Sequence, residues 1–114
     1  MSSLTALTYD LYIEQNATFK AAAQLVDANK QPLNLSTYIP KGQIRKNYKS
    51  DPIMTFSTLI ADPSSGKIYI TLTDEQTKQL PSGHLVYDVT LEDSNGNKYR
   101  VIEGTVEVSP YVTI

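Results

Sequence analysis

The chain has 114 residues, with ten basic and twelve acidic side chains, a net charge of −2 and no cysteine. This length corresponds to one domain, and the lack of cysteine excludes disulfides and thiolate metal sites. The balanced charge argues against nucleic acid or an anionic membrane as the partner, and no apolar run reaches the roughly 20 residues of a membrane span. We expect a flexible arm over residues 1–7 and a single domain over residues 8–114.

The first third of the chain predicts two strands and a turn. The segment Thr8–Ile13 is expected to be a strand with Leu11 and Ile13 on its buried side. The segment Thr18–Asp27 is expected to be the second strand, whose shared inner face consists of Phe19, Ala21, Ala23 and Leu25. The small alanine side chains indicate a close approach of two sheets. Turn formers over residues 27–32 then lead into a short apolar crossing over residues 33–38.

The middle of the chain predicts two further strands. Pro40 cannot donate a hydrogen bond to a ladder, so it is expected at a strand start or edge. The segment Gly42–Tyr48 is the third expected strand, with Ile44 pointing inward. The segment Ile53–Leu59 is the fourth, but its apolar residues do not keep one period, so its inner face stays unassigned.

The stretch from Lys67 to Asp93 is the most informative part of the chain. Two segments alternate strictly between apolar and polar residues, which predicts two strands with one buried face each; the apolar residues are Ile68, Ile70 and Leu72, then Leu85, Tyr87, Val89 and Leu91. Between them, Thr73 and Gln76 have the spacing of a helical capping box. A helical crossing between half-buried strands, with a tyrosine early in the second, is typical of immunoglobulin-like sandwiches.

The chain ends with a hairpin and a long strand. Residues 94–97 contain the Asn-Gly pair of a tight turn. The last strand is expected over Lys98–Val108, where Gly104 marks a bulge or a close backbone contact. The pattern therefore predicts an all-β fold: an immunoglobulin-like antiparallel β-sandwich of about seven strands with one short helix.

Four patterns that can carry chemistry each have a plainer interpretation. The one histidine, His84, follows the corner Pro81-Ser82-Gly83, and no nearby serine or cysteine is placed for nucleophilic use or for a zinc site. The acidic side chains Asp88, Glu92, Glu103 and Glu107 are expected to form a solvated face of the final hairpin. Residues 93–97 resemble the start of a calcium loop, but Gly104 stands where the bidentate glutamate belongs. The basic run Lys41, Arg45, Lys46 and Lys49 is expected to be a solvated strand face. We therefore expect no enzyme activity, no cofactor and no metal site.

Several short sequence segments, by their order and spacing, resemble a family of small bacteriophage virion proteins. They cover nearly the whole chain from Tyr9 onward and comprise residues 10–19, 26–28, 32–38, 43–46, 66–73, 76–83, 87–89 and 102–110. These segments are also similar to the N-terminal domain of upper-baseplate proteins of lactococcal phages. In those proteins a helical or receptor-binding extension follows the domain, whereas the present sequence ends at Ile114, which favours a stand-alone adaptor or decoration.

The resemblance implies a non-enzymatic structural component of a phage particle, an adaptor or connector in the tail, baseplate or neck. It implies other virion structural proteins as partners, a homo-oligomer within a symmetric assembly, no nucleic acid and no membrane, and a protein located in the virion after assembly in the host cytoplasm. The alternative is a carbohydrate-binding or host-attachment module of a virion, since tyrosines on such sandwiches can stack on sugars. The candidate interaction residues are Leu4, Leu7, Tyr12, Tyr48, Tyr69 and Tyr111.

Overall fold

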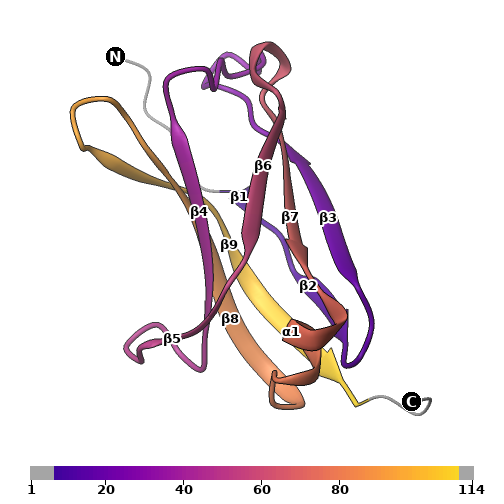
Figure 1. The fold of residues 1–114 in the computed structure, drawn as a ribbon. Helices are drawn as coiled ribbons and strands as arrows, with labels where there is room; N and C mark the ends of the chain where they lie inside the picture. The colour runs from indigo at the N-terminus through magenta and orange to yellow at the C-terminus, as the bar shows by residue number, and fades with distance from the viewer. Residues whose placement is uncertain (1–6, 111–114) are drawn as a thin grey trace.

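The computed structural model describes residues 7–110, which form two packed sheets and one short α-helix (Figure 1). The larger sheet has the strand order β1-β9-β8-β4-β5, with β2 also paired to β9, and the smaller has the order β3-β7-β6. The strands are β1 (Leu7–Thr8), β2 (Leu11–Glu14), β3 (Phe19–Gln24), β4 (Ile39–Arg45), β5 (Pro52–Thr55), β6 (Ser57–Asp62), β7 (Lys67–Leu72), β8 (Gly83–Glu92) and β9 (Lys98–Ser109). A 3-10 turn, η1 (Pro63–Ser65), precedes β7, and the helix α1 (Asp74–Lys78) follows it. The all-β sandwich is confirmed.

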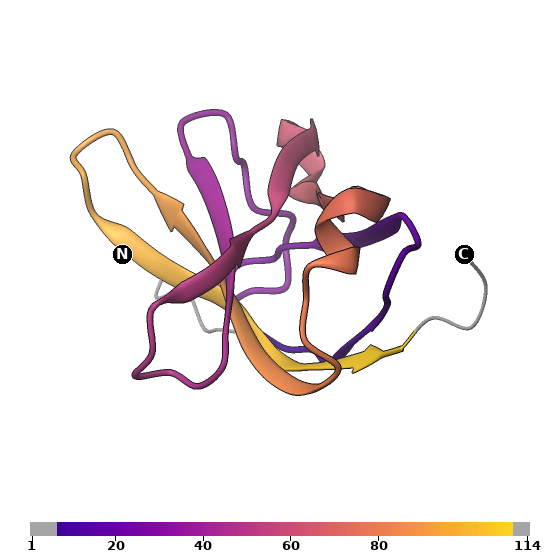
Figure 2. The same cartoon turned by 60° about the horizontal axis from the view of Figure 1, so that its bottom comes forward.

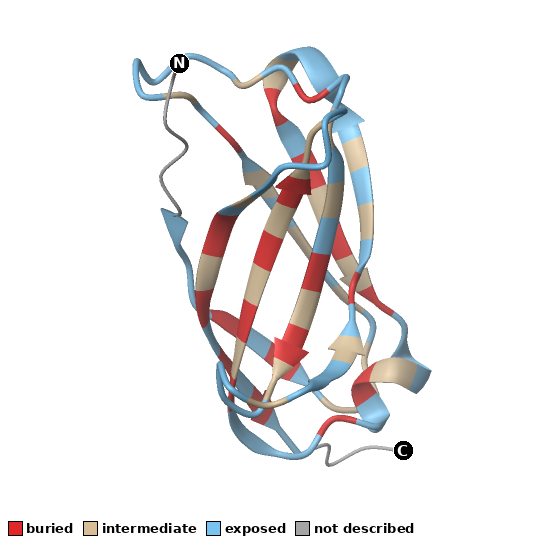
Figure 3. Ribbon diagram, turned by 90° about the vertical axis from the view of Figure 1, so that its left-hand side faces the viewer, coloured by how far each residue is buried: buried red, intermediate tan, exposed pale blue. Residues whose placement is uncertain are grey.

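The core lies between the two sheets and follows the predicted alternation of apolar residues (Figures 2 and 3). Inward residues of β7 and β8 are buried in strict alternation with half-buried or exposed ones. On β3, the predicted inner face is also correct, although Ala21 and Ala23 are only half-buried. Described residues contain no helix long and apolar enough to cross a membrane.

The helix α1 carries the chain from the smaller sheet to the larger one. Thr73 caps it: its hydroxyl accepts from the backbone N–H of Gln76, whose side chain in turn accepts from the N–H of Thr73. The predicted capping box is therefore confirmed. Thr77 is buried and donates to the carbonyl of Ala17 over 2.8 Å, which joins the helix to the turn between β2 and β3.

The expected fourth strand is two strands, because the chain changes sheets at Phe56. β5 pairs with β4 in the larger sheet, whereas β6 pairs with β7 in the smaller one. The Phe56 ring is buried between Phe19 and Tyr87, with both ring centroids 6.1 Å away. Its backbone N–H still donates to the carbonyl of Gly42 over 2.8 Å. The side of the chain that faces the core therefore changes at Phe56. This change explains why the apolar residues of 53–59 do not alternate regularly with polar ones.

The expected first strand is also interrupted, and it pairs differently from the prediction. β1 and β2 both run parallel to β9, so the sandwich is not purely antiparallel. Between them, the backbone at Tyr9 turns toward the core, where the hydroxyl of Tyr87 donates to the Tyr9 carbonyl. Asp10 accepts the backbone N–H of Thr105 over 3.1 Å. The backbone N–H of Tyr9 also donates to the carbonyl of Glu103 over 2.9 Å. With the division of the expected fourth strand into β5 and β6, this interruption turns the seven expected strands into nine.

Gly104 makes this interruption possible. It lies opposite Tyr87 on β9, and a Cβ atom placed on it would lie 2.2 Å from the carbonyl oxygen of Tyr9. Of the two predicted roles for this glycine, the close backbone contact is confirmed. The bulge of β9 lies elsewhere: the β8–β9 register shifts between Val89 and Thr90, where Val101 is inserted.

The bounds of three strands and of the arm differ from the prediction. β3 ends at Gln24 because Val26 and Pro32 form a separate bridge around the turn at Asp27. β4 begins before Pro40, which is its second residue, and ends at Arg45 because Asn47 and Ser50 form a tight turn. β9 continues one residue past the prediction, to Ser109. Residues 1–6 of the expected arm lie outside the described residues, and Leu7 belongs to β1.

Burial of Tyr87 predicts a specific loss of stability at alkaline pH. Burial, and then the nearby Asp10 carboxylate, raise the pKa of Tyr87 above its ordinary value of 10.0. The stability gained by keeping this proton is complete below the unfolded-state pKa and is lost as pH rises from 10.0 toward the folded-state pKa. We expect chemical denaturation at pH about 8 and about 11 to show a larger loss for the wild type than for Tyr87→Phe. Equal losses would contradict the assignment to Tyr87.

Candidate functional site

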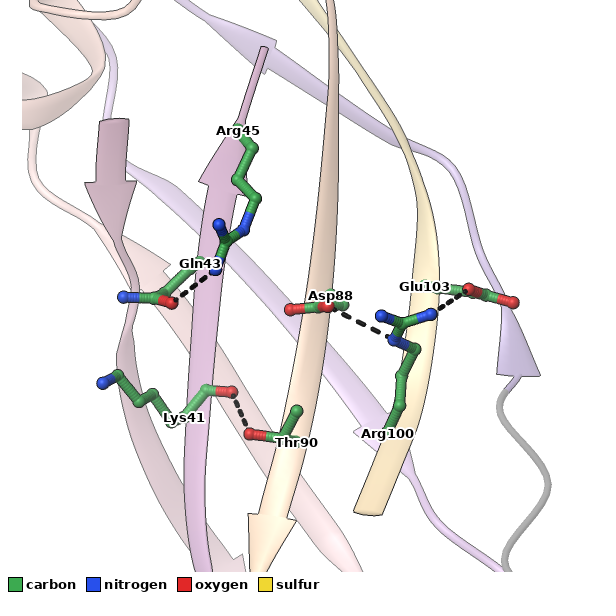
Figure 4. Close-up of polar contacts among 7 residues, drawn as sticks. All are labelled: Lys41, Gln43, Arg45, Asp88, Thr90, Arg100 and Glu103. Carbon is green, nitrogen blue, oxygen red and sulfur yellow. Dashed lines mark hydrogen bonds and ion pairs between the residues drawn. The ribbon is translucent and has the colours of Figure 1, made fainter. Parts of the chain in front are cut away.

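The outer face of the larger sheet carries a continuous set of polar side chains, here called the polar face (Figure 4). It comprises Lys41, Gln43, Arg45, Asp88, Thr90, Arg100 and Glu103, from β4, β8 and β9. Strand register builds it in rows: Gln43 lies opposite Asp88, which lies opposite Glu103. In the adjacent row, Thr90 lies between Lys41 and Arg100. Because these residues alternate with core residues, the same pattern that builds the core also builds this face.

The bulge at Val101 brings two opposite charges of β9 onto this face. In a regular strand, residues three apart point to opposite faces. Here Val101 and Ile102 are both buried, so Arg100 and Glu103 both point outward. Their side chains are joined by a contact of 3.3 Å between Nη1 of Arg100 and Oε2 of Glu103.

Arg100 also pairs with Asp88, which makes it the centre of a three-residue ionic network. Its Nε lies 3.2 Å from Oδ2 of Asp88, whose side chain is only 18% exposed. Exposed ion pairs contribute about 0–1 kcal/mol each, so the network orients these side chains more than it stabilises the fold. The guanidinium thereby joins a carboxylate of β8 to a carboxylate of β9.

Tyr48 lies over this network from the loop between β4 and β5. Its ring centroid is 5.7 Å from Cζ of Arg100, a cation–π distance. Burial, followed by the Glu103 carboxylate, raises the pKa of the Tyr48 hydroxyl. The phenol can donate a hydrogen bond to a partner.

Arg45 holds the β4–β5 loop in place. Its Nη1 donates to the carbonyl of Ser50 over 2.7 Å, and its Nη2 donates to Oε1 of Gln43 over 3.4 Å. The guanidinium is thus engaged with its own chain. Of the predicted basic run, Lys41 and Arg45 lie on β4, whereas Lys46 and Lys49 lie in the loop that follows it. The three lysines are exposed.

A shallow groove of about 320 Å³ runs along the polar face. Its lining residues are Ile39, Lys41, Gln43, Arg45, Asp88, Thr90, Glu92 and Lys98. Cations from β4 lie on one side and carboxylates from β8 on the other, without an ion pair between these two strands among residues 7–110. The groove therefore offers donors and acceptors side by side, which suits binding of a polar surface. The residues that line the groove include no serine or histidine, so they contain no nucleophile paired with a general base.

The six candidate interaction residues do not gather in one place. Tyr12, 72% exposed on β2, and Tyr48, 50% exposed, both lie on the outer side of the larger sheet. Tyr69 lies on the outer side of the smaller sheet, between Lys20 and Lys67. Leu7 lies on β1, at the edge of the larger sheet. Leu4 and Tyr111 lie outside the described residues.

The other patterns have the positions that their plainer interpretations require. His84 is exposed and lies 3.4 Å from Glu107, its neighbour across β8 and β9. The four acidic residues of the final hairpin all lie on its outer face. Asp93 accepts the backbone N–H groups of Asn95 and Asn97, so its carboxylate closes the hairpin turn. These hydrogen bonds, with that of Asn97 the largest cause, lower the pKa of Asp93. The described residues contain no group of three or more potential metal ligands.

Sequence reasoning missed Arg100, Gln43 and Thr90 as members of one site. Alternation along β4 gives Gln43 the same side as Lys41 and Arg45, a signal that was available. The side of Arg100 depends on the bulge, and two consecutive apolar residues, Val101 and Ile102, were the available signal for it.

No protein-family model matches the chain, and no curated protein matches it.

Proposed function

We propose that this protein is a non-enzymatic structural component of a bacteriophage particle, an adaptor or connector in the tail, baseplate or neck. The observation that carries the proposal is the ordered resemblance to small phage virion proteins from Tyr9 onward. The resembling segments are distributed over both sheets and the helix, so they concern the whole sandwich and not one local motif.

The polar face supports an adaptor role because its composition suits a protein partner. Arginine and tyrosine are enriched where proteins bind one another, and a few such residues carry most of the binding energy. Here Arg100 is held by Asp88 and Glu103 and covered by Tyr48, so the group needs little reordering on binding. The partners are other virion structural proteins, including further copies of this chain in a symmetric assembly. The protein resides in the virion, which is assembled in the host cytoplasm.

Particle incorporation tests the proposal. Tagged protein, expressed while the phage that encodes it assembles, is expected to co-sediment with purified particles through a density gradient. Tyr48→Ala is expected to lower incorporation by roughly tenfold, as loss of a tyrosine anchor does at interfaces. Leu59→Ala, which removes an exposed side chain on β6 outside the polar face, is the control and should incorporate normally. Recovery of the wild-type protein only in the unassembled fraction would refute the proposed function.

A second candidate function is carbohydrate binding by a host-attachment module. The observation that favours it is the polar groove of about 320 Å³, with Tyr48 beside Arg100 at the same face. Glycan-array binding by the isolated protein, lost in Tyr48→Ala and kept in Tyr69→Ala, would support this function. Co-sedimentation with particles but no glycan binding would support the adaptor.

A further inference from the structure

An apolar groove lies at the side of the sandwich where the edges of the two sheets face each other. Its volume is about 300 Å³. One wall comes from β1 and the start of β2, with Leu7, Tyr9 and Leu11, and the other comes from Ala21 to Gln24 of β3. The rim residues Leu7 and Tyr9 are both exposed. Because the inward residues Ala21 and Ala23 are small and only half-buried, this side of the core is incompletely filled.

The edge strand beside this groove has only one of the features that normally prevent strand pairing, the exposed Lys20. β3 forms six consecutive pairs with β7 without a register shift, contains no proline, and points no charge inward. Its outer edge has no strand partner among residues 7–110.

The other described edges do carry such features. β5 begins with Pro52, and its pairing with β4 shifts register. β6 shifts register after Ile60, and Thr58 on it donates to the carbonyl of Pro40. β1 and β2, which form the edge of the larger sheet beside β9, have only two and four residues. β3 is thus the edge best suited to accept another strand.

The charges beside β3 indicate the chemistry of that strand. Nζ of Lys20 lies 4.2 Å from the Tyr69 ring centroid, and Nζ of Lys67 lies 5.4 Å from it. The ion pairs among residues 7–110 involve His84, Arg100 and their carboxylate partners, so neither lysine has a carboxylate there. An added strand would place its outward side chains beside Lys20 of β3, with Lys67 one strand further away on β7, and its inward side chains in the apolar groove.

We propose that β3 and the adjoining groove bind an extended segment of a partner protein, in which apolar side chains alternate with acidic ones. The backbone of the segment pairs with β3, and its apolar side chains fill the space left by Ala21 and Ala23. The six residues of β3 accommodate about 20 Å of extended chain. This surface is separate from the polar face, and its test uses the purified protein alone, so it can fail while particle incorporation succeeds.

The probe is an acetylated and amidated octapeptide in which leucine alternates with glutamate. We expect it to change the amide chemical shifts of Ala21 to Gln24 and to slow hydrogen exchange along β3. A peptide of the same composition with its leucines contiguous, and one with lysine in place of glutamate, should bind much more weakly.

Two variants of the protein test the two parts of the site. Ala23→Leu fills the groove from within and should weaken binding by about tenfold or more, the effect of one aliphatic side chain left unburied. Lys20→Glu should weaken it by roughly two- to fivefold, as expected for an exposed charge contact. The controls are Ala28→Leu and Lys49→Glu, which make the same changes at exposed positions outside the groove.

Four outcomes would overturn the proposal. The first is no change at β3, and the second is equal binding of the contiguous peptide. The third is concentration-dependent self-association that protects the β3 amides, which would make a second copy the occupant. The fourth is protection of the outer β3 amides in dilute monomer without peptide, which would make the chain's own residues the occupant.

Discussion

Replacement of Tyr87 by alanine is expected to destabilise the protein by about 3–5 kcal/mol, the range for truncating a buried aromatic residue. The Tyr87 side chain is 1% exposed, and its ring packs edge-on against Phe56 at 6.1 Å between centroids. Its hydroxyl also donates to the carbonyl of Tyr9, at the interruption between β1 and β2. The substitution therefore removes core packing and leaves one end of the β1–β2 connection without its hydrogen bond.

Urea denaturation with a two-state fit measures this loss, and Tyr69→Ala is its control. Tyr69 lies on the outer side of β7, half-buried beneath Lys20, so its truncation should reduce stability by about 1 kcal/mol or less. Tyr87→Phe keeps the ring and should lose about 1–2 kcal/mol, the effect of one buried hydrogen-bond partner. Similar losses for Tyr87→Ala and Tyr69→Ala would contradict the assignment of the two faces.

The second large effect is expected for Gly104→Ala, at about 3 kcal/mol, the upper range for overpacking a well-packed site. The new methyl group would lie 2.2 Å from the carbonyl oxygen of Tyr9 and 2.8 Å from its carbonyl carbon. Backbone atoms cannot rotate away as a side chain does, so the Tyr9 segment must move. That movement breaks the hydrogen bond from Tyr87 and the β1 pairing next to it.

A second glycine of the larger sheet is the control for this substitution. In Gly42→Ala, the new methyl group would meet side-chain atoms, Cδ2 of Phe56 at 3.0 Å and Cγ2 of Val89 at 3.3 Å. These can shift by a few tenths of an ångström, so a loss near 1 kcal/mol is expected. Denaturation midpoints give the two losses, and hydrogen exchange should show faster opening at Tyr9 in Gly104→Ala only. A loss for Gly104→Ala no larger than that for Gly42→Ala would argue against the close approach.

The parts of the fold that follow from local pattern were predictable from the sequence. Strict alternation gave the inner faces of β7 and β8, and side-chain chemistry at Thr73 and Gln76 gave the helix start. The interruption at Tyr9 was not predictable, because it depends on contacts with Tyr87 and Gly104 from distant parts of the chain. The parallel pairing of β1 and β2 with β9 likewise depends on tertiary structure and not on local period.

The candidate site shows the same division. Alternation predicts which residues of β4 and β8 point outward, and the acidic face of the final hairpin was predicted correctly. The pairing of Arg100 with Asp88 and Glu103 requires the β8–β9 register, including the shift at Val101. A one-residue shift changes which side chains share a face. The β4–β8 register, which builds the groove, joins strands about 45 residues apart and has no local signal.

The passage of residues 52–62 through both sheets determines how the layers can move relative to each other. Phe56 connects the sheets covalently on the β4–β6 side and is packed against Phe19 and Tyr87. Within residues 7–110, the opposite side, between β1 and β3, has no such connection along its length, only the turn that joins β2 to β3 at one end. We therefore expect any separation of the two layers to be smallest near Phe56 and largest between β1 and β3.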